Sequence, residues 1–491
     1  MKALALCFAV GIGLVPTWGW AGEVLVEADA SPRPPAQARR TVHGEVRFGA
    51  GFGFIAEDPV ASLEPSLALD LRDVVPIQIR LGGPLRLRIY DRDPAQGGVI
   101  RGTDWDEAGD FVAILEQLEY TESHAVGERG QADFDLRVGG LGRVQLGHGS
   151  LVSGYANSLD LDRRRSGIDF FGRIDGALLD RPAGVEMGLV VGDLAGDGIF
   201  GGRVAADWVG AALGFSVVGD PGAPRTTTPV GMGAAGLSID RHNRPIFAGD
   251  RGVVALGLDL SYRFTDRWRY LLTPYLDLNV MPGLGKGLHL GLDGEVAVGR
   301  RHAARLGIRG EMTAGDSSYD PAYFDVFYGY QRWQVPFVGA RGDVPADLTT
   351  VALPKAGFVA TRDLGGIGGY GGVRFAHDDG AFVETGFRYR PGPLGQSWET
   401  RVGVDMEVVH LALLLAHRGR LGVDLIDPAG TLASFDLAVP VLTYLDVTAR
   451  AGWLYAVRRV AGETAAAGVP SSGYVGGAGI VLVGAAGRFP W

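Results

Sequence analysis

Apolar and polar residues alternate with a period of two along most of the chain from Thr41 onward. Between Val254 and Phe264 every second residue is valine, leucine or aromatic, while Asp259 and Ser261 occupy positions in between. Successive side chains of a β-strand point to opposite faces, so this pattern predicts strands with one apolar and one polar face. Further ladders of this kind cover residues 268–280, 288–298, 306–312 and 445–455.

The ladders are long, and the first four follow one another with only short turns between them. A soluble β-sandwich would also alternate, but two features favour a membrane barrel. The ladders reach about ten residues, the length of a tilted bilayer crossing, and aromatic residues such as Tyr262, Trp268 and Tyr455 lie at their ends. The sequence therefore predicts an all-β fold, a transmembrane antiparallel up-and-down β-barrel of about 18 strands within a range of roughly 16–20.

The end of the chain carries a pattern that suggests a cellular location. Val481, Val483, Ala485, Gly487 and Phe489 alternate with other residues up to a terminal tryptophan, Trp491. This stretch resembles the C-terminal strand of bacterial outer-membrane β-barrels, whose last aromatic residue is read by the barrel-insertion machinery. The resemblance implies an outer-membrane location, with Phe489 and Trp491 as the insertion signal. It also implies outer-membrane lipid and the insertion machinery as partners.

The N-terminal residues divide the chain before the barrel begins. Lys2 precedes an apolar stretch too short to span a bilayer as a helix, and small residues at Gly19 and Ala21 suit cleavage. We expect a signal peptide at 1–21, a polar periplasmic linker at 22–40 and the barrel at 41–491. Cys7, the only cysteine, lies in the signal peptide, so the mature chain is expected to have no disulfide.

Composition and motifs argue against several kinds of function. The chain has 46 basic and 56 acidic residues, a net charge of −10 that argues against a nucleic-acid partner. No motif for a metal or cofactor appears, so none is predicted. The acidic stretch from Asp91 to Asp110 is a weak calcium candidate, because it lacks the spacing of a calcium-binding loop.

Barrels of the expected size enclose a lumen, and polar residues of the central ladders are predicted to line it. The first interpretation of function is therefore a pore or channel for small solutes. Its predicted lumen-lining residues are Arg263, Arg267, Arg269, Asp277, Asp293, Glu295, Arg305, Arg309 and Glu311.

The longest region without alternation runs from 315 to 354 and is rich in aromatic residues. It is expected at the barrel mouth, with Tyr323, Phe327, Tyr330 and Trp333 as its candidate site residues. One hypothesis is a constriction or a ligand-binding loop whose aromatic faces suit sugars or lipids. The other is a surface loop that packs on its own aromatic side chains.

Two further functions remain open at this point. The chain could be a structural or export component of an envelope-spanning machine for polysaccharide export or surface motility, which would make other envelope proteins its partners. It could also be a hydrolase, since His148 and Ser150 resemble the dyad of an outer-membrane lipid A deacylase. A dyad needs an orienting carboxylate that the sequence does not place, so no catalytic residue is predicted.

Overall fold

The computed structural model describes most of the chain beyond the predicted linker. The described residues are 42–55, 58–90, 99–126, 130–178, 181–196, 198–226, 237–240, 243–247, 249–266, 270–299, 303–335, 353–361, 363–378, 380–391, 395–406, 408–419, 430–460 and 471–490. The predicted signal peptide and linker, together with Arg267, Arg269 and Trp491, lie outside this set.

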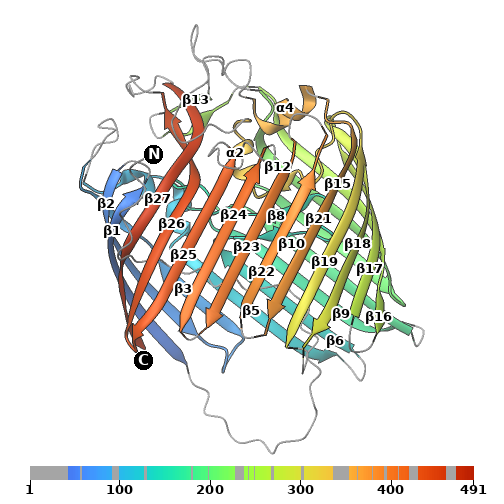
Figure 1. The fold of residues 1–491 in the computed structure, drawn as a ribbon, viewed down its shortest axis with the longest axis horizontal. Coiled ribbons are helices and arrows are strands. Elements are labelled where there is room, and N and C mark those ends of the chain that lie inside the picture. The colour runs from blue at the N-terminus through green and yellow to red at the C-terminus, as the bar shows by residue number, and fades with distance from the viewer. Residues whose placement is uncertain are drawn as a thin grey trace, which may run out of the picture.

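A closed antiparallel barrel of 20 strands forms the wall of the molecule (Figure 1). Its strands are β1 (His43–Ile55), β2 (Asp58–Asp70), β3 (Ile77–Gly82), β5 (Leu115–Val126), β6 (Gly130–Gly139), β9 (Gly167–Leu178), β10 (Arg181–Val191), β11 (Phe200–Trp208), β12 (Ala211–Pro224), β15 (Arg251–Tyr262), β17 (Tyr270–Met281), β18 (Gly285–Val298), β19 (Ala304–Gly315), β21 (Gly366–His377), β22 (Ala381–Tyr389), β23 (Ser397–Met406), β24 (Val409–Arg418), β25 (Thr431–Leu442), β26 (Leu445–Arg459) and β27 (Ser471–Pro490).

Backbone pairing between the first and last strands closes the wall. Residues Glu45–Ile55 of β1 pair with Ile480–Pro490 of β27, and the other edge of β1 pairs with β2. Closure removes the exposed strand edges that hydrocarbon does not tolerate. The predicted all-β, up-and-down barrel is confirmed, with a strand count at the upper limit of the expected range.

The two ends of the barrel differ in the length of their connections. At one end the turns are short, as at Val209–Gly210 between β11 and β12. The connections at the other end include 140–166, 225–250 and 316–365. Short turns face the periplasm and long loops face the exterior in outer-membrane barrels, which orients the molecule.

Small elements supplement the wall and fill the inside of the barrel. They are β4 (Leu85–Arg88), η2 (Gly102–Asp104), α1 (Ala108–Val112), β7 (Val144–Gln145), β8 (Val152–Tyr155), β13 (Leu237–Ile239), β14 (Pro245–Ile246), β16 (Phe264–Asp266), β20 (Phe324–Asp325), α2 (Tyr328–Gln331) and α4 (Lys355–Thr361). In the described part of the chain, no helix has the length and apolar character of a membrane span.

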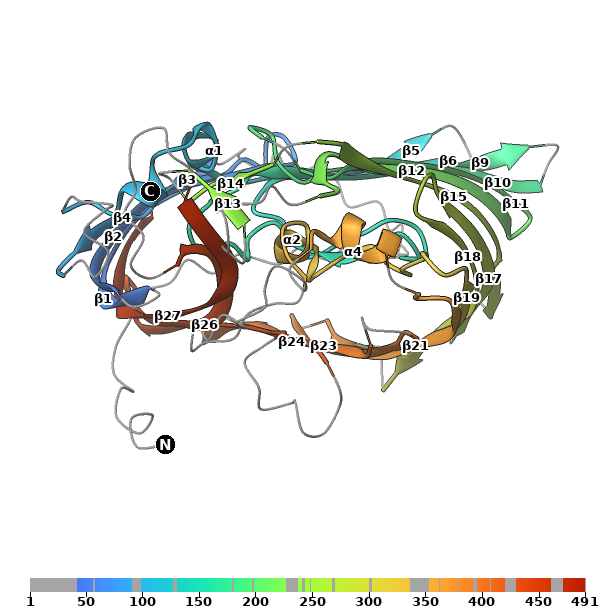
Figure 2. The ribbon, with the colours of Figure 1, turned by 90° about the horizontal axis from the view of Figure 1, so that it is seen from above.

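Three segments from the long-loop end lie inside the barrel, as the view from above shows (Figure 2). They are residues 141–166, 316–335 and the described part of 353–365 (353–361 and 363–365), which we call the internal plug. Strand β8 of the first segment pairs in parallel with β20 of the second, and antiparallel with β7, in a separate three-stranded sheet. Apolar clusters join the plug to inward wall residues, for example Val152 and Phe324 to Val218 and Ala255.

Candidate functional site in the barrel interior

The lower interior, toward the short turns, is a charged vestibule that is partly open to solvent. The side chains of Asp293 and Glu295 on β18 are 38% and 39% exposed, and that of Arg305 on β19 is 36% exposed. Further up the same two strands, His289 and Glu311 have completely buried side chains. The vestibule therefore ends where the wall meets the plug.

Glycines in the wall make room for plug side chains. A Cβ atom on Gly287 of β18 would lie 2.1 Å from the Tyr319 ring of the plug. Gly285 is similarly tight, because its Cβ would lie 2.6 Å from the backbone nitrogen of Tyr319. Contacts shorter than 3.0 Å would force a shift of the neighbour. The plug is thus fitted to this part of the wall and does not merely occupy an open lumen.

A buried group of five charges, which we call the latch, ties the plug to the wall. Lys355 of α4 lies 2.9 Å from Asp320, and its ammonium group donates to the Tyr323 carbonyl oxygen at 2.6 Å. Arg390, which follows β22, lies 2.8 Å from Asp320 and 3.2 Å from Asp325. Arg418 at the end of β24 also binds Asp325. The latch thus joins two wall strands to both later plug segments.

The charges of the latch depend on one another. Burial raises the pKa of Asp325, but the positive charges of Arg418, Lys355 and Arg390 outweigh burial and hold it well below its usual range. Burial lowers the pKa of Lys355, against the opposing effect of Asp320 and Asp325. Removing one of the two carboxylates would leave the buried cations of this group with less compensation.

A second polar network links Tyr319 of the plug to the wall through His289. The His289 ring lies 2.9 Å from Glu311 through Nδ1 and 2.6 Å from the Tyr319 hydroxyl through Nε2. The same hydroxyl oxygen accepts a hydrogen bond from Asn279 Nδ2 at 2.9 Å. Tyr319 is therefore joined to two wall residues, and the other ring nitrogen of His289 faces the Glu311 carboxylate.

Glu311 is the centre of the wall side of this network. Its carboxylate also accepts hydrogen bonds from Arg309 at 2.6 Å, Tyr275 at 2.7 Å and Arg388 at 3.2 Å. These three donors lie on β19, β17 and β22. The network therefore fixes the position of Tyr319 from several strands at once.

The two residues of the suspected dyad make different contacts in the structure. His148 stacks on Tyr275 with ring centroids 4.1 Å apart, and its Nδ1 lies 2.9 Å from Asp277. Ser150 is buried nearby, but among the hydrogen bonds of the described residues none joins its hydroxyl to His148. Asp277 supplies the orienting carboxylate that the sequence could not place, yet here it anchors a plug histidine to the wall.

The predicted aromatic residues of the long loop lie in the interior and not at an open mouth. Tyr323, Phe327 and Tyr330 are almost completely buried, whereas Trp333 is partly exposed and stacks on Phe247. Tyr330 also packs edge-on against Tyr455 of the wall, with ring centroids 5.9 Å apart. The loop packs on its own aromatic side chains, as the second hypothesis expects, but it does so inside the barrel.

The predicted lumen-lining residues fall into three groups. Asp293, Glu295 and Arg305 line the vestibule, whereas Asp277, Arg309 and Glu311 contact or surround the plug. Arg263 lies in the short turn after β15, where its backbone N–H donates to the Gly210 carbonyl oxygen at 2.8 Å. The open lumen that a simple pore would have is absent at the level of the described plug residues.

No group of three or more potential metal ligands occurs among the residues that the structure describes. The weak calcium candidate at Asp91–Asp110 falls partly outside them. Within its described part, Asp104 binds Arg86 at 3.0 Å and also contacts Arg101. Asp110 caps α1 by accepting the Glu107 backbone N–H at 3.0 Å. These carboxylates therefore take part in loop structure.

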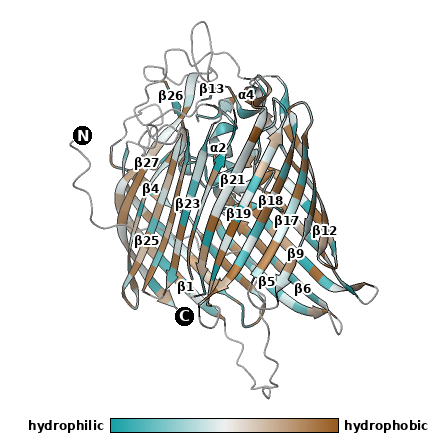
Figure 3. Ribbon diagram, turned by 45° about the vertical axis from the view of Figure 1, so that its right-hand side comes forward, coloured by the Kyte–Doolittle hydropathy of each residue, from teal (hydrophilic) through white to brown (hydrophobic). Residues whose placement is uncertain are grey.

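The outer face of the wall is apolar. Leu258, Leu276, Leu290 and Met312 are exposed on four successive strands, and hydrophobic positions alternate with polar ones along the ribbons (Figure 3). Exposed aromatic side chains form a girdle at the short-turn end: Trp208, Tyr262, Phe264, Tyr270, Tyr444 and Phe489. A closed barrel with such an exterior is built to stand in lipid.

The protein is an outer-membrane β-barrel. Phe489, one half of the predicted insertion signal, belongs to the aromatic girdle, and its role in insertion remains a prediction. The apolar exterior, and not the content of the interior, carries this assignment.

Comparison with known proteins adds no family. No family model and no curated protein matches the chain. Among solved structures, a mutant of the Rh. blastica porin aligns over 92% of this chain and 99% of its own at 8% identity, with a TM-score of 0.25. The Acinetobacter baumannii protein OccAB4 aligns over 93% and 100% at 10% identity and a TM-score of 0.33. The ferric enterobactin receptor PfeA aligns over 92% and 82% at 10% identity and a TM-score of 0.34. Likenesses this weak carry no argument about function.

Proposed function

We propose that this barrel is an outer-membrane channel for small polar solutes that is closed by its own internal plug and conducts when the plug shifts. The observation that carries the proposal is the change in exposure along β18 and β19. The side chains of Asp293, Glu295 and Arg305 are more than one third exposed, whereas His289 and Glu311 above them are sealed by the plug.

The way the plug is held supports a movable closure. Its apolar contacts are supplemented by the latch and by the His289 network, which join it to separate wall strands. Buried ion pairs often contribute little net stability compared with apolar packing, and the best-attested reason to retain them is specificity or switching. The plug strands β7, β8 and β20 form a sheet separate from the barrel sheet, so displacement of the plug would leave the hydrogen bonds between barrel strands intact.

The charge of the vestibule favours cations. The inward faces of β6, β9, β10 and β11 carry six carboxylates against three arginines: Asp133, Asp135, Asp169, Asp175, Glu186 and Asp207 against Arg137, Arg173 and Arg203. A passage lined by an excess of one sign of charge concentrates ions of the opposite sign. Open channels are therefore expected to prefer cations over anions.

Single-channel recording of the refolded barrel in a planar bilayer tests the proposal. We expect long closed periods with rare openings, and a reversal potential that indicates cation preference when the two sides differ in salt concentration. A steady open conductance would contradict the closed resting state, and anion preference would contradict the assignment of the vestibule.

The filled interior also favours a second candidate, a structural or export component of an envelope machine. Such a protein needs a stable barrel and no conductance of its own. It differs from a closed channel in one respect. Variants that disrupt the latch in a folded, inserted barrel would conduct if the protein is a channel and would remain silent if it is a scaffold.

A further inference from the structure

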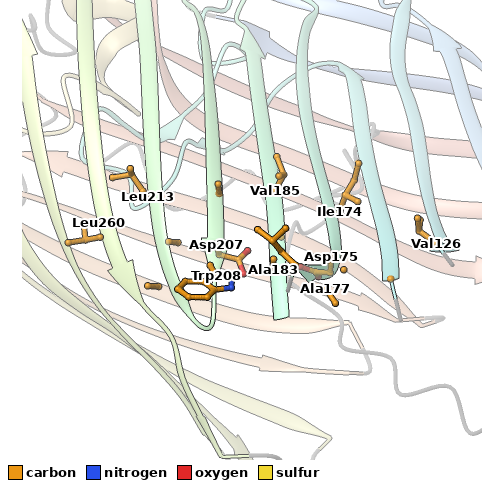
Figure 4. Close-up of a pocket in the computed structure, with 17 residues that line it drawn as sticks. Val126, Ile174, Asp175, Ala177, Ala183, Val185, Asp207, Trp208, Leu213 and Leu260 are labelled. Atoms are coloured by element: carbon orange, nitrogen blue, oxygen red, sulfur yellow. The ribbon is translucent and has the colours of Figure 1, made fainter. Parts of the chain in front are cut away.

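An apolar hollow lies on the outer surface of the wall near the short-turn end (Figure 4). It has a volume of about 710 Å³ and extends across β9, β10, β11 and β12 to β15. Its floor consists of small residues, among them Ala183, Ala206 and Ala211. Exposed larger side chains, including Val185, Leu213 and Leu260, border it.

The hollow begins at the level of the aromatic girdle. Trp208, one of its lining residues, is 52% exposed and belongs to that girdle, which marks the boundary between the apolar part of the membrane and the headgroups. Because the short turns face the periplasm, this boundary belongs to the inner leaflet of the membrane. An occupant would thus approach from that leaflet.

A basic residue is paired across two strands with a lining residue of the hollow. Arg181 begins β10 directly opposite Leu178, a lining residue, and it is exposed. The β11–β12 turn lies beside it, because the Val209 backbone N–H donates to the Pro182 carbonyl oxygen at 2.9 Å. An exposed guanidinium at headgroup level is suited to bind a phosphate group.

The two acidic residues at the hollow do not oppose an anionic occupant. Asp175 and Asp207 both lie against Gly184 and bind Arg173, at 2.9 Å and 3.2 Å respectively. Their charge is thus shared with an arginine on the lumen side. The rim charge on the outer surface remains that of Arg181.

We propose that this hollow is a binding site for a glycerophospholipid of the periplasmic leaflet, with an acyl chain in the hollow and the phosphate at Arg181. The volume lies within the roughly 300–1,000 Å³ that small-molecule sites occupy. The apolar lining matches the chain, the girdle sets the depth, and the arginine matches the headgroup charge. The site is independent of the plug and of the proposed channel function.

Native mass spectrometry of the full-length barrel, delipidated in detergent and titrated with phosphatidylglycerol, tests this site. Ala206→Trp fills the floor of the hollow, and Arg181→Gln removes the rim charge. Ile308→Trp, an exposed outward position on β19 at the other side of the barrel, is the matched control. Each variant is first checked for folding by its heat-dependent electrophoretic mobility.

We expect Ala206→Trp to lose the tightest-bound lipid and Arg181→Gln to weaken phosphatidylglycerol binding by about fivefold, while Ile308→Trp leaves both unchanged. Equal lipid binding by the wild type and Ala206→Trp would overturn the proposal. So would an equal loss in the control. A change from a dimer to a monomer on Ala206→Trp would also overturn it, because the hollow would then seat a second barrel.

Discussion

The substitution Asp325→Asn tests the latch most sharply. In the closed state the latch holds three cations, Lys355, Arg390 and Arg418, against Asp320 and Asp325. Without the Asp325 carboxylate the three cations face one anion, and the buried net charge rises from +1 to +2. Removing one partner of a buried ion pair costs about 3–5 kcal/mol.

That cost falls on the closed state, because an open plug exposes the same groups to water. A factor of ten corresponds to about 1.4 kcal/mol, so the ratio of open to closed channels should rise by roughly two to three and a half orders of magnitude. The assay is the open probability in single-channel recordings, with folding confirmed by heat-dependent mobility.

Two matched variants separate the latch from general damage. Lys355→Met leaves two cations and two anions in balance, so its effect should be clearly smaller than that of Asp325→Asn. Asp363→Asn changes an exposed carboxylate in the same connection and should leave the open probability unchanged. A folded Asp325→Asn barrel with the open probability of the wild type would refute the reasoning.

Four further outcomes are expected. Gly287→Ala should displace Tyr319 and raise the open probability, whereas Gly310→Ala on the next strand, where a Cβ meets nothing within 4 Å, should not; equal effects would contradict the fitted plug. Tyr319→Phe removes the hydroxyl that His289 and Asn279 share, which costs the closed state about 1–3 kcal/mol. Hydrogen exchange of the backbone amides in 316–335 should become faster, and unchanged exchange would count against the network. The pKa of Asp325 is held far below its usual range, so the ionised carboxylate stabilises the closed plug at every pH above that lowered pKa. The open probability should therefore not increase between pH 7 and pH 5. A steep increase in that range would contradict the ion pairing. The double charge reversal Asp293→Arg and Glu295→Arg should reduce cation preference in the Asp325→Asn background, and an unchanged reversal potential would place the ion path elsewhere.

The wall could be predicted from the sequence because lipid and lumen impose opposite demands on alternate residues. Leu288, Leu290 and Leu292 face lipid, and the polar positions between them face inward, so the ladders identified β15 to β19 well. Strand ends were harder to predict, because glycine-rich stretches such as Gly366–Gly372 of β21 carry too few side chains to show the alternation of apolar and polar residues.

The sequence did not predict the plug, and the physical reasons differ from those that obscure the strand ends. Its elements β7, β8, β20 and α2 are two to four residues long, too short to show a period. Their stability comes from contacts with distant wall residues. In the sequence Gly287 does not differ from other glycines of the barrel, and only the fold places the Tyr319 ring against it. The sequence feature that marks this region is a run of aromatic residues without alternation at 319–333, which was predicted to lie at the barrel mouth and not in the interior.

Lys355 shows the limit of composition as evidence. The scarcity of lysine beside abundant arginine reads as a bias of the genome, yet one of the three lysines in the sequence is completely buried at the centre of the latch. Only the fold brings it to Asp320 and Asp325, beside Arg390 after β22 and Arg418 of β24.

The most direct test of the closed plug is the accessibility of a single thiol at Thr313, a buried inward position of β19 at plug level. The only natural cysteine, Cys7, lies in the predicted signal peptide, so Thr313→Cys would give the mature chain one thiol. A membrane-impermeant charged maleimide should leave this thiol unmodified in the otherwise wild-type barrel and modify it in the Asp325→Asn background. Rapid modification without the second substitution would mean that the lumen is open, and would contradict the account.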